Sequence, residues 1–201
     1  MGIYTTKNSW QRALQPAVDL CVRRRVHPDV FTYAALTLSL LATAALYLAG
    51  LDKDWLWLVP PCVLLRLVFN LMDGQVARSL GMADDWGEVK NEFGDRVADA
   101  TLFGALGLGG YADARLALVA LATVLCVSYL GLLGKALGGL RYYGGVFGKG
   151  DRMITLAIFT LYPAFTGRLG SYDYFLGLAA GAALITIAQR LKVLHDRSQS
   201  P

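Results

Sequence analysis

Carboxylates gather in one short stretch of a chain that is otherwise rich in apolar residues. Asp95 and Asp99 are four positions apart, and Glu92 precedes Asp95 by three positions. In an α-helix these spacings place side chains on one face, so the sequence predicts an acidic stripe along a helix. Like charges repel, so cations should neutralise the stripe. Oxygen ligands in this number, without a nearby His or Cys, favour Mg²⁺, Mn²⁺ or Ca²⁺ over zinc.

A second group of polar residues lies upstream, where an apolar run ends. Asp73 supplies another carboxylate, Gly74 allows close approach of a bulky ligand, and Arg78 offers a fork of donors that fits phosphate oxygens. Together with the acidic stripe, this group predicts a site for a phosphate-bearing substrate. A pair of metal ions there could stabilise the attacking and leaving oxygens of a phosphoryl displacement. For Asp84 and Asp85 we favour a simpler interpretation, a salt bridge with Arg78.

Long uncharged blocks flank these polar groups and place the chain in a membrane. Of the 201 residues, 55% are hydrophobic and 17% are charged, and the mean hydropathy is +0.45. Residues 31–51 contain no charge, and a helix of that length can cross a bilayer by itself. The sequence therefore predicts an all-α integral membrane protein with six transmembrane helices. We expect these helices at about 31–51, 55–72, 91–110, 113–133, 153–167 and 172–189.

The distribution of Lys and Arg predicts how the helices are oriented. Most of the 19 Lys and Arg residues fall before the first predicted helix, in every second loop and after the last helix. Positively charged loops stay in the cytoplasm, so both termini and the carboxylate-rich loop are expected there, in an inner or plasma membrane. Met1–Trp10 leads into no apolar core of a signal peptide. Cys21, Cys62 and Cys126 form no CxxC pair and are interpreted as small buried hydrophobic residues.

The first residues form a separate segment of the predicted fold. Leu14, Val18, Cys21 and Val22 recur at helical spacing, and three arginines follow at 23–25. This pattern predicts an amphipathic helix at the membrane interface, and a plain basic topogenic segment explains it equally well. We divide the chain into an N-terminal interfacial segment (1–27), a six-helix domain (28–190) and a cytoplasmic tail (191–201).

The run Asp73-Gly74-Gln75-Val76-Ala77-Arg78 resembles the central part of the signature of the CDP-alcohol phosphotransferase family. That signature reads Asp, two residues, Asp-Gly, two residues, Ala-Arg, about eight residues, Gly, three residues, Asp, three residues, Asp. Here Asn70 replaces the first aspartate, which is similar to a branch of the family with Asn at that position. The hydropathy pattern extends the resemblance to nearly the whole chain.

The second half of the signature admits two registers. With eight residues after Arg78, Gly87 takes the glycine position, but Asn91 and Asp95 then take the two aspartate positions. With twelve residues, Asp95 and Asp99 both fit and Asn91 takes the glycine position. We favour the second register because it retains three of the four aspartates. Glu92 then lies on the same stripe and could replace the carboxylate that is lost at Asn70.

The resemblance implies a membrane enzyme of phospholipid biosynthesis, usually a homodimer. Such enzymes transfer a phosphatidyl-type group from a CDP-linked donor to the hydroxyl of an alcohol acceptor and release CMP. The expected donor is CDP-diacylglycerol, and the sequence does not determine the acceptor. Membrane lipids are further expected partners, and nucleic acid is not.

The resemblance also implies roles for individual residues. Two divalent ions, Mg²⁺ or Mn²⁺, would be bound by Asp73, Asp95 and Asp99, with Glu92 and Asn70 as helpers. The CDP moiety would contact Asp73, Gly74, Ala77 and Arg78. Asp99 would be the catalytic base that takes the proton from the acceptor hydroxyl.

Other interpretations remain open at this point. Arg141, Lys149 and Arg152 belong to a basic, glycine-rich loop that could hold an acceptor phosphate or a lipid phosphate, or could be ordinary cytoplasmic positive charge. A Mg²⁺-dependent intramembrane prenyltransferase would also use acidic motifs and metal ions. A non-enzymatic cation transporter would use an acidic stripe without any nucleotide.

Overall fold

The computed structural model describes residues 7–137 and 142–199, and these ranges contain helices and no strand. The α-helices are α1 (Lys7–Arg23), α2 (Asp29–Leu48), α3 (Val59–Ser79), α4 (Asp85–Leu108), α5 (Ala114–Ala136), α6 (Lys149–Thr166) and α7 (Tyr172–Ser198). Short 3₁₀ helices at Lys53–Leu58 and Leu169–Ser171 precede α3 and α7. The prediction of an all-α fold is confirmed.

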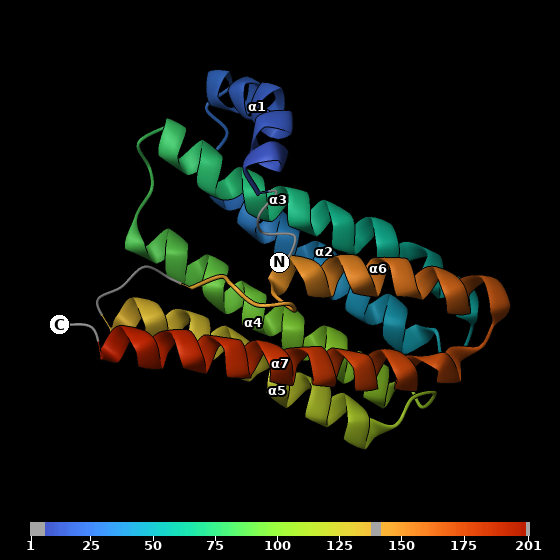
Figure 1. The fold of residues 1–201 in the computed structure, drawn as a ribbon. Helices are drawn as coiled ribbons and strands as arrows, with labels where there is room; N and C mark the ends of the chain where they lie inside the picture. The colour runs from blue at the N-terminus through green and yellow to red at the C-terminus, as the bar shows by residue number, and fades with distance from the viewer. Residues whose placement is uncertain (1–6, 138–141, 200–201) are drawn as a thin grey trace.

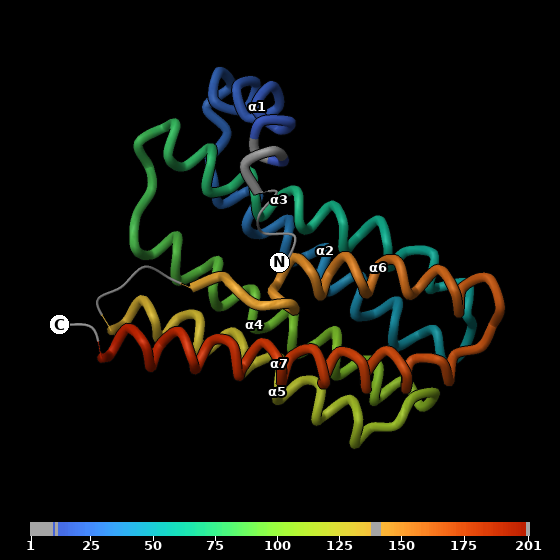
Figure 2. The backbone as a smooth tube through the Cα atoms, viewed as in Figure 1, coloured from blue at the N-terminus to red at the C-terminus, as the bar shows by residue number. Residues whose placement is uncertain are grey.

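Helices α2 to α7 form one bundle with a shared core (Figures 1 and 2). Helix α2 packs against α3 and α4, α5 packs against α4 and α7, and α6 packs against α3 and touches α7. Small side chains allow the helix backbones to approach closely in this core. They include Ala42, Ala45, Ala105, Ala117, Ala120, Ala179 and Ala183.

Four helical segments of the described residues are long and apolar enough to cross a membrane. They are Asp29–Leu48, Lys53–Ser79, Ala114–Ala136 and Leu169–Ser198. Helices α4 and α6 fall outside this group, and both carry charges, such as Asp95 and Asp99 on α4 and Arg152 on α6. The structure thus supports four of the six predicted transmembrane helices by length and composition, and the other two stay a prediction.

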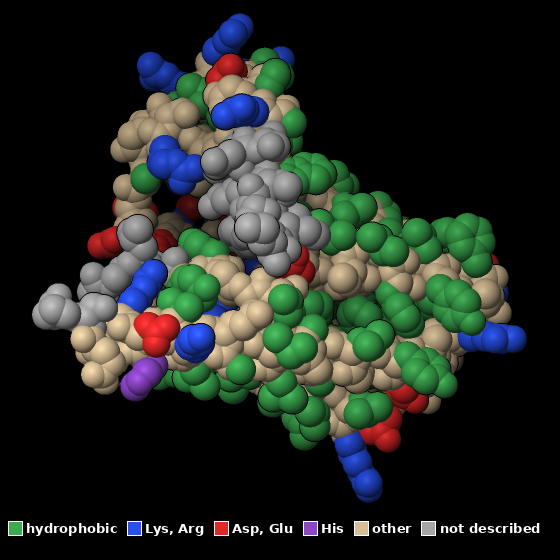
Figure 3. Space-filling view, in the orientation of Figure 1, with side chains coloured by type: hydrophobic (Ala, Val, Ile, Leu, Met, Phe, Trp, Pro, Cys, Tyr) green, Lys and Arg blue, Asp and Glu red, His purple; other side chains and the backbone are tan. Residues whose placement is uncertain are grey.

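The outside of the bundle is apolar where a lipid environment would contact it. Hydrophobic side chains cover much of the visible face of α3, α6 and α7 (Figure 3). Leu178 on α7 and Phe165 on α6 are each 72% exposed. Apolar surface of this extent is costly in water and is favourable in a bilayer.

Helix α1 crosses one end of the bundle rather than standing apart from it (Figure 1). Val18 is fully buried, and Leu14, Cys21 and Val22 pack with it against Met72 and other residues of α2 and α3. The predicted amphipathic helix is therefore present. Its apolar stripe is at least partly covered by protein, and a position at the membrane interface stays a prediction.

The polar residues singled out in the sequence meet at this same end of the bundle. The C-terminal end of α3 and the N-terminal ends of α2, α4 and α6 lie there (Figure 1). Helix α3 continues to Ser79, so the whole motif from Asn70 to Arg78 is helical. A short turn containing Gly81, whose φ is +68°, then reverses the chain into α4.

Candidate active site

A cavity of about 450 Å³ opens between α2, α3, α4 and α6 at the end near α1. It brings together eight of the residues that the sequence singled out. They are Asn70, Asp73, Gly74, Ala77, Arg78, Glu92, Asp95 and Lys149. Side chains that are up to 79 positions apart in the sequence, from Asn70 to Lys149, therefore share one polar space.

Helix α3 supplies one wall of the cavity from a single face. Asn70, Asp73, Gly74, Ala77 and Arg78 stand at positions i, i+3, i+4, i+7 and i+8, which lie along one face of a helix. A Cβ atom on Gly74 would lie 3.2 Å from Nη1 of Arg78. The glycine therefore gives the guanidinium of Arg78 room to lie close to the helix.

Asp73 is held in place by two hydrogen bonds. Its Oδ2 atom accepts a hydrogen bond from Oγ1 of Thr32 on α2 at 3.3 Å, and its Oδ1 atom accepts one from the backbone N–H of Gly74 at 2.5 Å. The side chain is buried, 6% exposed, yet it lines the cavity. A carboxylate so fixed keeps lone pairs available for a cation in the cavity.

Helix α4 supplies the opposite wall. Gly87, Asn91 and Asp95, each four positions apart, all line the cavity. Asp84 starts this helix by accepting a hydrogen bond from the backbone N–H of Gly87 at 2.7 Å, as an N-cap residue does. Within the described ranges no carboxylate pairs with Arg78, so the simple interpretation of Asp84 and Asp85 as its salt-bridge partners is wrong.

Lys90 links α4 to the start of α2 at the rim of the cavity. Its ammonium group donates a hydrogen bond to the carboxylate of Asp29. This hydrogen bond raises the pKa of Lys90 above its usual value, so the side chain stays charged. The pair fixes the two helix starts that frame the cavity.

Asp95 is the most heavily neutralised carboxylate of the cavity. It is 3% exposed, and Nη2 of Arg66 on α3 lies 3.0 Å from its Oδ1 atom. The ammonium group of Lys149 on α6 lies 2.6 Å from its Oδ2 atom. Two cations from two other helices therefore hold one buried anion, an arrangement in which the pairing offsets the desolvation cost.

Asp99 does not line this cavity. It is 1% exposed, and its Oδ2 atom lies 2.7 Å from Nη2 of Arg152 and 3.3 Å from Nη2 of Arg96. Asp99 lies one helical turn beyond Asp95, deeper in the bundle, so the acidic stripe is divided between two environments. The predicted set of Asp73, Asp95 and Asp99 around shared ions is not brought together. Among the residues that the structure describes, no three Asp, Glu, His or Cys side chains form a metal cage.

Glu92, the third member of the stripe, lies at the edge of the cavity. It lines the cavity and is also within 3.8 Å of Nη1 of Arg96. Its side chain is mostly covered, with 15% exposed. Glu92 and Asn70 both line this cavity. A compensating role for Glu92 stays a prediction.

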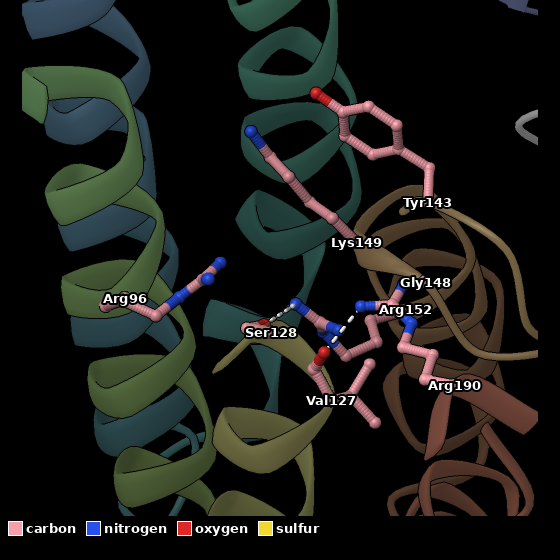
Figure 4. A pocket seen from close by; sticks show the side chains of 8 residues that line it. All are labelled: Arg96, Val127, Ser128, Tyr143, Gly148, Lys149, Arg152 and Arg190. Atoms are coloured by element: carbon pink, nitrogen blue, oxygen red, sulfur yellow. Dashed lines mark hydrogen bonds between the residues drawn. The ribbon is translucent and has the colours of Figure 1, made fainter. Parts of the chain in front are cut away.

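A small basic pocket lies next to the cavity, between α4, α5, α6 and α7 (Figure 4). Its volume is about 20 Å³, and four cationic residues line it, Arg96, Lys149, Arg152 and Arg190. Figure 4 shows Arg96 and Arg152 pointing into the pocket from α4 and α6, above Ser128 of α5. Lys149 lines both this pocket and the larger cavity, so it stands where the two meet.

The basic pocket holds donors that no described residue accepts from. Nε of Arg96 and Nε of Arg152 are buried and have no hydrogen-bond partner among the described residues. Nη2 of Arg152 reaches Oγ of Ser128 at only 3.4 Å in addition to Asp99. Buried donors without partners are costly, and an anionic ligand would satisfy them.

Arg190 is a site residue that the sequence interpretation missed. Its Nη1 atom donates a hydrogen bond to the carbonyl of Val127. Its Nε atom donates one to the carbonyl of Gly144 at 2.9 Å. In the sequence it follows the last apolar block and resembles ordinary cytoplasmic positive charge. The sequence offers no clear signal for Arg190 beyond its helical spacing from Thr186, which the structure shows to be buried on the same face. Arg141, which was predicted to act with Lys149 and Arg152, lies outside the described residues.

Gly131 on α5 makes the position of Arg190 possible. A Cβ atom there would lie 2.6 Å from Nη1 of Arg190 and 3.0 Å from the carbonyl oxygen of Tyr142. Gly131→Ala should therefore displace the guanidinium of Arg190 and destabilise the protein by about 1–3 kcal/mol. Thermal unfolding in detergent would check this. Gly181→Ala on α7, where the added Cβ meets nothing within 4 Å, is the control.

Comparison with known proteins identifies the protein family of this chain. The sequence profile of the CDP-alcohol phosphatidyltransferase family matches residues 25–189. The chain is 30% identical over 189 residues to the inner membrane protein YnbA of Escherichia coli (strain K12), covering 94% of this chain and 93% of that protein. It is 25% identical over 205 residues to the phosphatidylinositol phosphate synthase of Cutibacterium acnes, covering 95% and 96%.

Solved structures agree with the sequence relatives. The Mycobacterium tuberculosis phosphatidylinositol phosphate synthase PgsA1 with CDP-DAG bound has a TM-score of 0.70 and 27% identity, covering 90% of this chain and 92% of that chain. The same enzyme in complex with manganese and citrate also has a TM-score of 0.70 and 27% identity, covering 88% and 86%.

The chain therefore belongs to the CDP-alcohol phosphatidyltransferase family. It is an integral membrane enzyme of phospholipid biosynthesis that transfers a phosphatidyl-type group from a CDP-linked lipid donor to an alcohol acceptor. The family works with a divalent metal ion, Mg²⁺ or Mn²⁺. The family match removes the prenyltransferase and the cation transporter as alternatives.

Proposed function

We propose that the cavity of about 450 Å³ binds the nucleotide and diphosphate of CDP-diacylglycerol. The carrying observation is that two helix faces line this one cavity. They contribute Asn70, Asp73, Gly74, Ala77 and Arg78 from α3, and Gly87, Asn91 and Asp95 from α4. These are all the signature positions when eight residues separate Arg78 from the glycine. We therefore adopt that register in place of the one with twelve residues, which needs Asp99 in the cavity.

In this register Asp73 and Asp95 are the two remaining signature carboxylates, and we assign them as metal ligands. Asn91 fits beside them, because its Oδ1 atom is buried and has no hydrogen-bond partner among the described residues. Amide oxygens are ordinary ligands of hard cations. When bound, the metal supplies positive charge that stabilises the departing CMP. Asn70 and Glu92, which also line the cavity, are assigned as helpers.

Arg78 is assigned to the donor diphosphate. Its guanidinium lines the cavity, and no carboxylate of the described residues holds it. A free guanidinium binds phosphate oxygens through two parallel hydrogen bonds. Gly74 and Ala77 have small side chains, so the cytidine and its phosphates can approach the backbone of α3 beside Arg78.

The basic pocket supports an acceptor that itself carries a phosphate. Arg152 and Arg190 line it, together with Arg96 and Lys149, and two of its arginine Nε atoms have no partner. Several related proteins are named phosphatidylinositol phosphate synthases. We therefore propose a phosphorylated polyol, with inositol phosphate as the first candidate, as the acceptor.

Asp95 is assigned as the base that takes the proton from the acceptor hydroxyl. A base must lie within hydrogen-bond reach of the proton that it removes. Asp95 lines the donor cavity, and its partner Lys149 lines both the cavity and the basic pocket. An acceptor with its phosphate in the pocket would thus direct a hydroxyl toward Asp95. Asp99, buried between Arg96 and Arg152, is assigned to positioning those arginines.

We further propose the membrane arrangement that the sequence predicted. Helices α4 and α6 complete six transmembrane helices, because each packs inside the bundle beside helices that are long and apolar enough to cross. Both termini and the active site face the cytoplasm, in an inner membrane, with α1 at the interface. The divisions at 1–27, 28–190 and 191–201 are kept, and the enzyme acts as a homodimer in contact with membrane lipids.

The acceptor assignment is tested with purified protein and CDP-diacylglycerol labelled in the lipid. Inositol phosphate, glycerol phosphate, inositol and serine are offered one at a time, and CMP release and lipid products are measured. CMP release is expected with phosphorylated acceptors and at least about a hundredfold slower with neutral ones, which carry no anion to accept from the Nε atoms of Arg96 and Arg152. Equal rates with inositol and inositol phosphate would contradict the proposal.

A further inference from the structure

The donor cavity has fewer anions than its signature positions would allow. In the register that the cavity supports, two of the four acidic positions are the amides Asn70 and Asn91. Only Asp73 and Asp95 remain as carboxylates at these positions. An amide can ligate a cation through its oxygen, but it contributes no charge to balance one.

A small void beside the two amides is lined without any carboxylate. Its volume is about 10 Å³, the size of one water molecule, and Thr32, Arg66, Asn70 and Asn91 line it together with apolar groups and Gly94. Nη1 of Arg66 and Oδ1 of Asn91 are buried and without hydrogen-bond partners in the described part of the chain. Arg66 is 1% exposed, and its guanidinium, paired with Asp95 through Nη2, borders the void. The void therefore suits a water or a ligand oxygen, and it has no room or carboxylate for a second divalent cation beside the one in the larger cavity.

Lys149 already occupies one of the carboxylate oxygens that a second ion would use. Its ammonium group lies 2.6 Å from Oδ2 of Asp95, while Arg66 takes Oδ1 at 3.0 Å. Lys149 also interacts electrostatically with Asp73 across the cavity. An internal cation thus lies between the two carboxylates, in contact with one of them.

The charges of these four side chains balance one another. Asp73 and Asp95 carry negative charge, and Arg66 and Lys149 carry an equal positive charge. Of the other charged residues that line the cavity, Arg78 and Glu92 offset each other, and Asp29 and Glu88 are paired with Lys90 and Lys135. One divalent ion beside Asp73 and Asp95 would therefore leave two positive charges, which match a donor diphosphate with one negative charge on each phosphate. A second divalent ion would leave an excess of positive charge beside the internal cations Arg66 and Lys149, which is unfavourable.

We propose that this active site binds one divalent ion, held by Asp73 and Asn91 with Asp95, and that the ammonium group of Lys149 takes the place of the second ion. The inference rests on the proposed function only in naming the diphosphate as the ligand. The family resemblance implied two ions, and this inference replaces them with one ion and Lys149. Lys149 is then part of the donor site.

Counting bound Mn²⁺ tests this inference without any enzymatic turnover. Full-length protein in detergent is titrated with Mn²⁺, and free Mn²⁺ is measured by electron paramagnetic resonance. One ion per chain is expected for the wild type. The double variant Asn70→Asp/Asn91→Asp, which restores both carboxylates, is expected to bind a second ion. Two ions per wild-type chain of similar affinity, or one ion in the double variant, would overturn the inference.

Substitutions of Lys149 test whether its ammonium group takes the place of a second divalent ion. Lys149→Met removes a positive charge beside the ion, so Mn²⁺ affinity should rise by about tenfold or more. Lys149→Arg keeps the charge, so Mn²⁺ affinity should change much less than in Lys149→Met. If Lys149 only holds Asp95 in position, Lys149→Met would instead weaken Mn²⁺ binding, and this result would refute its role as a resident cation.

The same samples separate this inference from the proposed function. Binding of CDP is measured in parallel by calorimetry, with and without Mn²⁺. If one Mn²⁺ binds per chain but CDP does not bind, the proposed donor site is wrong and the inference of one ion stands. If CDP binds normally but two Mn²⁺ bind per wild-type chain, the donor site stands and the inference of one ion is wrong.

Discussion

Replacing Asp95 by asparagine should lower CMP release by at least about a thousandfold, because the substitution removes both a metal ligand and the proposed base. The variant should be less stable, because Arg66 and Lys149 lose their anion, but an asparagine Oδ1 atom can still accept the hydrogen bond that Arg66 donates at 3.0 Å. The measurement is CMP release from CDP-diacylglycerol at saturating acceptor. Thermal unfolding of both proteins in the same detergent would verify the fold.

Asp99→Asn is the matched control, four positions along the same helix. Its carboxylate contacts Arg96 and Arg152 and not the donor cavity. We expect kcat at saturating acceptor within about tenfold of the wild type, with the main effect on the KM for the acceptor. If Asp99→Asn instead abolished CMP release while Asp95→Asn kept it, the register with twelve residues would be right and the donor-site assignment wrong.

Arg152→Met should raise the KM for a phosphorylated acceptor by about a hundredfold, the loss expected when a charge-assisted pair of hydrogen bonds disappears. The variant also removes a partner at 2.7 Å from the buried carboxylate of Asp99, so it should be less stable, by up to about 3 kcal/mol. Steady-state kinetics and thermal unfolding would measure the two effects separately.

The double variant Asp99→Asn/Arg152→Met separates binding from folding. It removes both members of the buried ion pair, so stability should return toward that of the wild type. The KM for the acceptor should remain high, because the phosphate has still lost its arginine. Recovery of the KM together with the stability would mean that Arg152 serves only as the structural partner of Asp99.

Much of the site could be predicted from sequence because it depends on one helix. Asn70, Asp73, Gly74 and Arg78 share a face of α3 through their spacing alone, and the cavity contains all four. The membrane class and the family also followed from local patterns, the uncharged blocks and the motif around Asp73. These features need no knowledge of which helix packs against which.

The choice between the two registers could not be made in the same way. Counting aspartates favoured Asp99, since helical spacing places Asp95 and Asp99 on one face. In the bundle, one helical turn separates a residue at the cavity from a residue buried against α6. The partners that distinguish the surroundings of Asp95 and Asp99, Arg66 and Arg152, lie 29 and 53 positions away from them respectively.

By itself, then, the sequence determined the helices, the apolar surface that suits a membrane and the face of α3 that carries the motif, because each arises from residues within a few turns of one another. The tertiary structure decided which carboxylates share a space and which cations neutralise them. It brought Lys149 of α6 to Asp95 and Arg190 of α7 to the basic pocket. Charges act through space rather than along the chain, so their balance at a site exists only after the helices have packed.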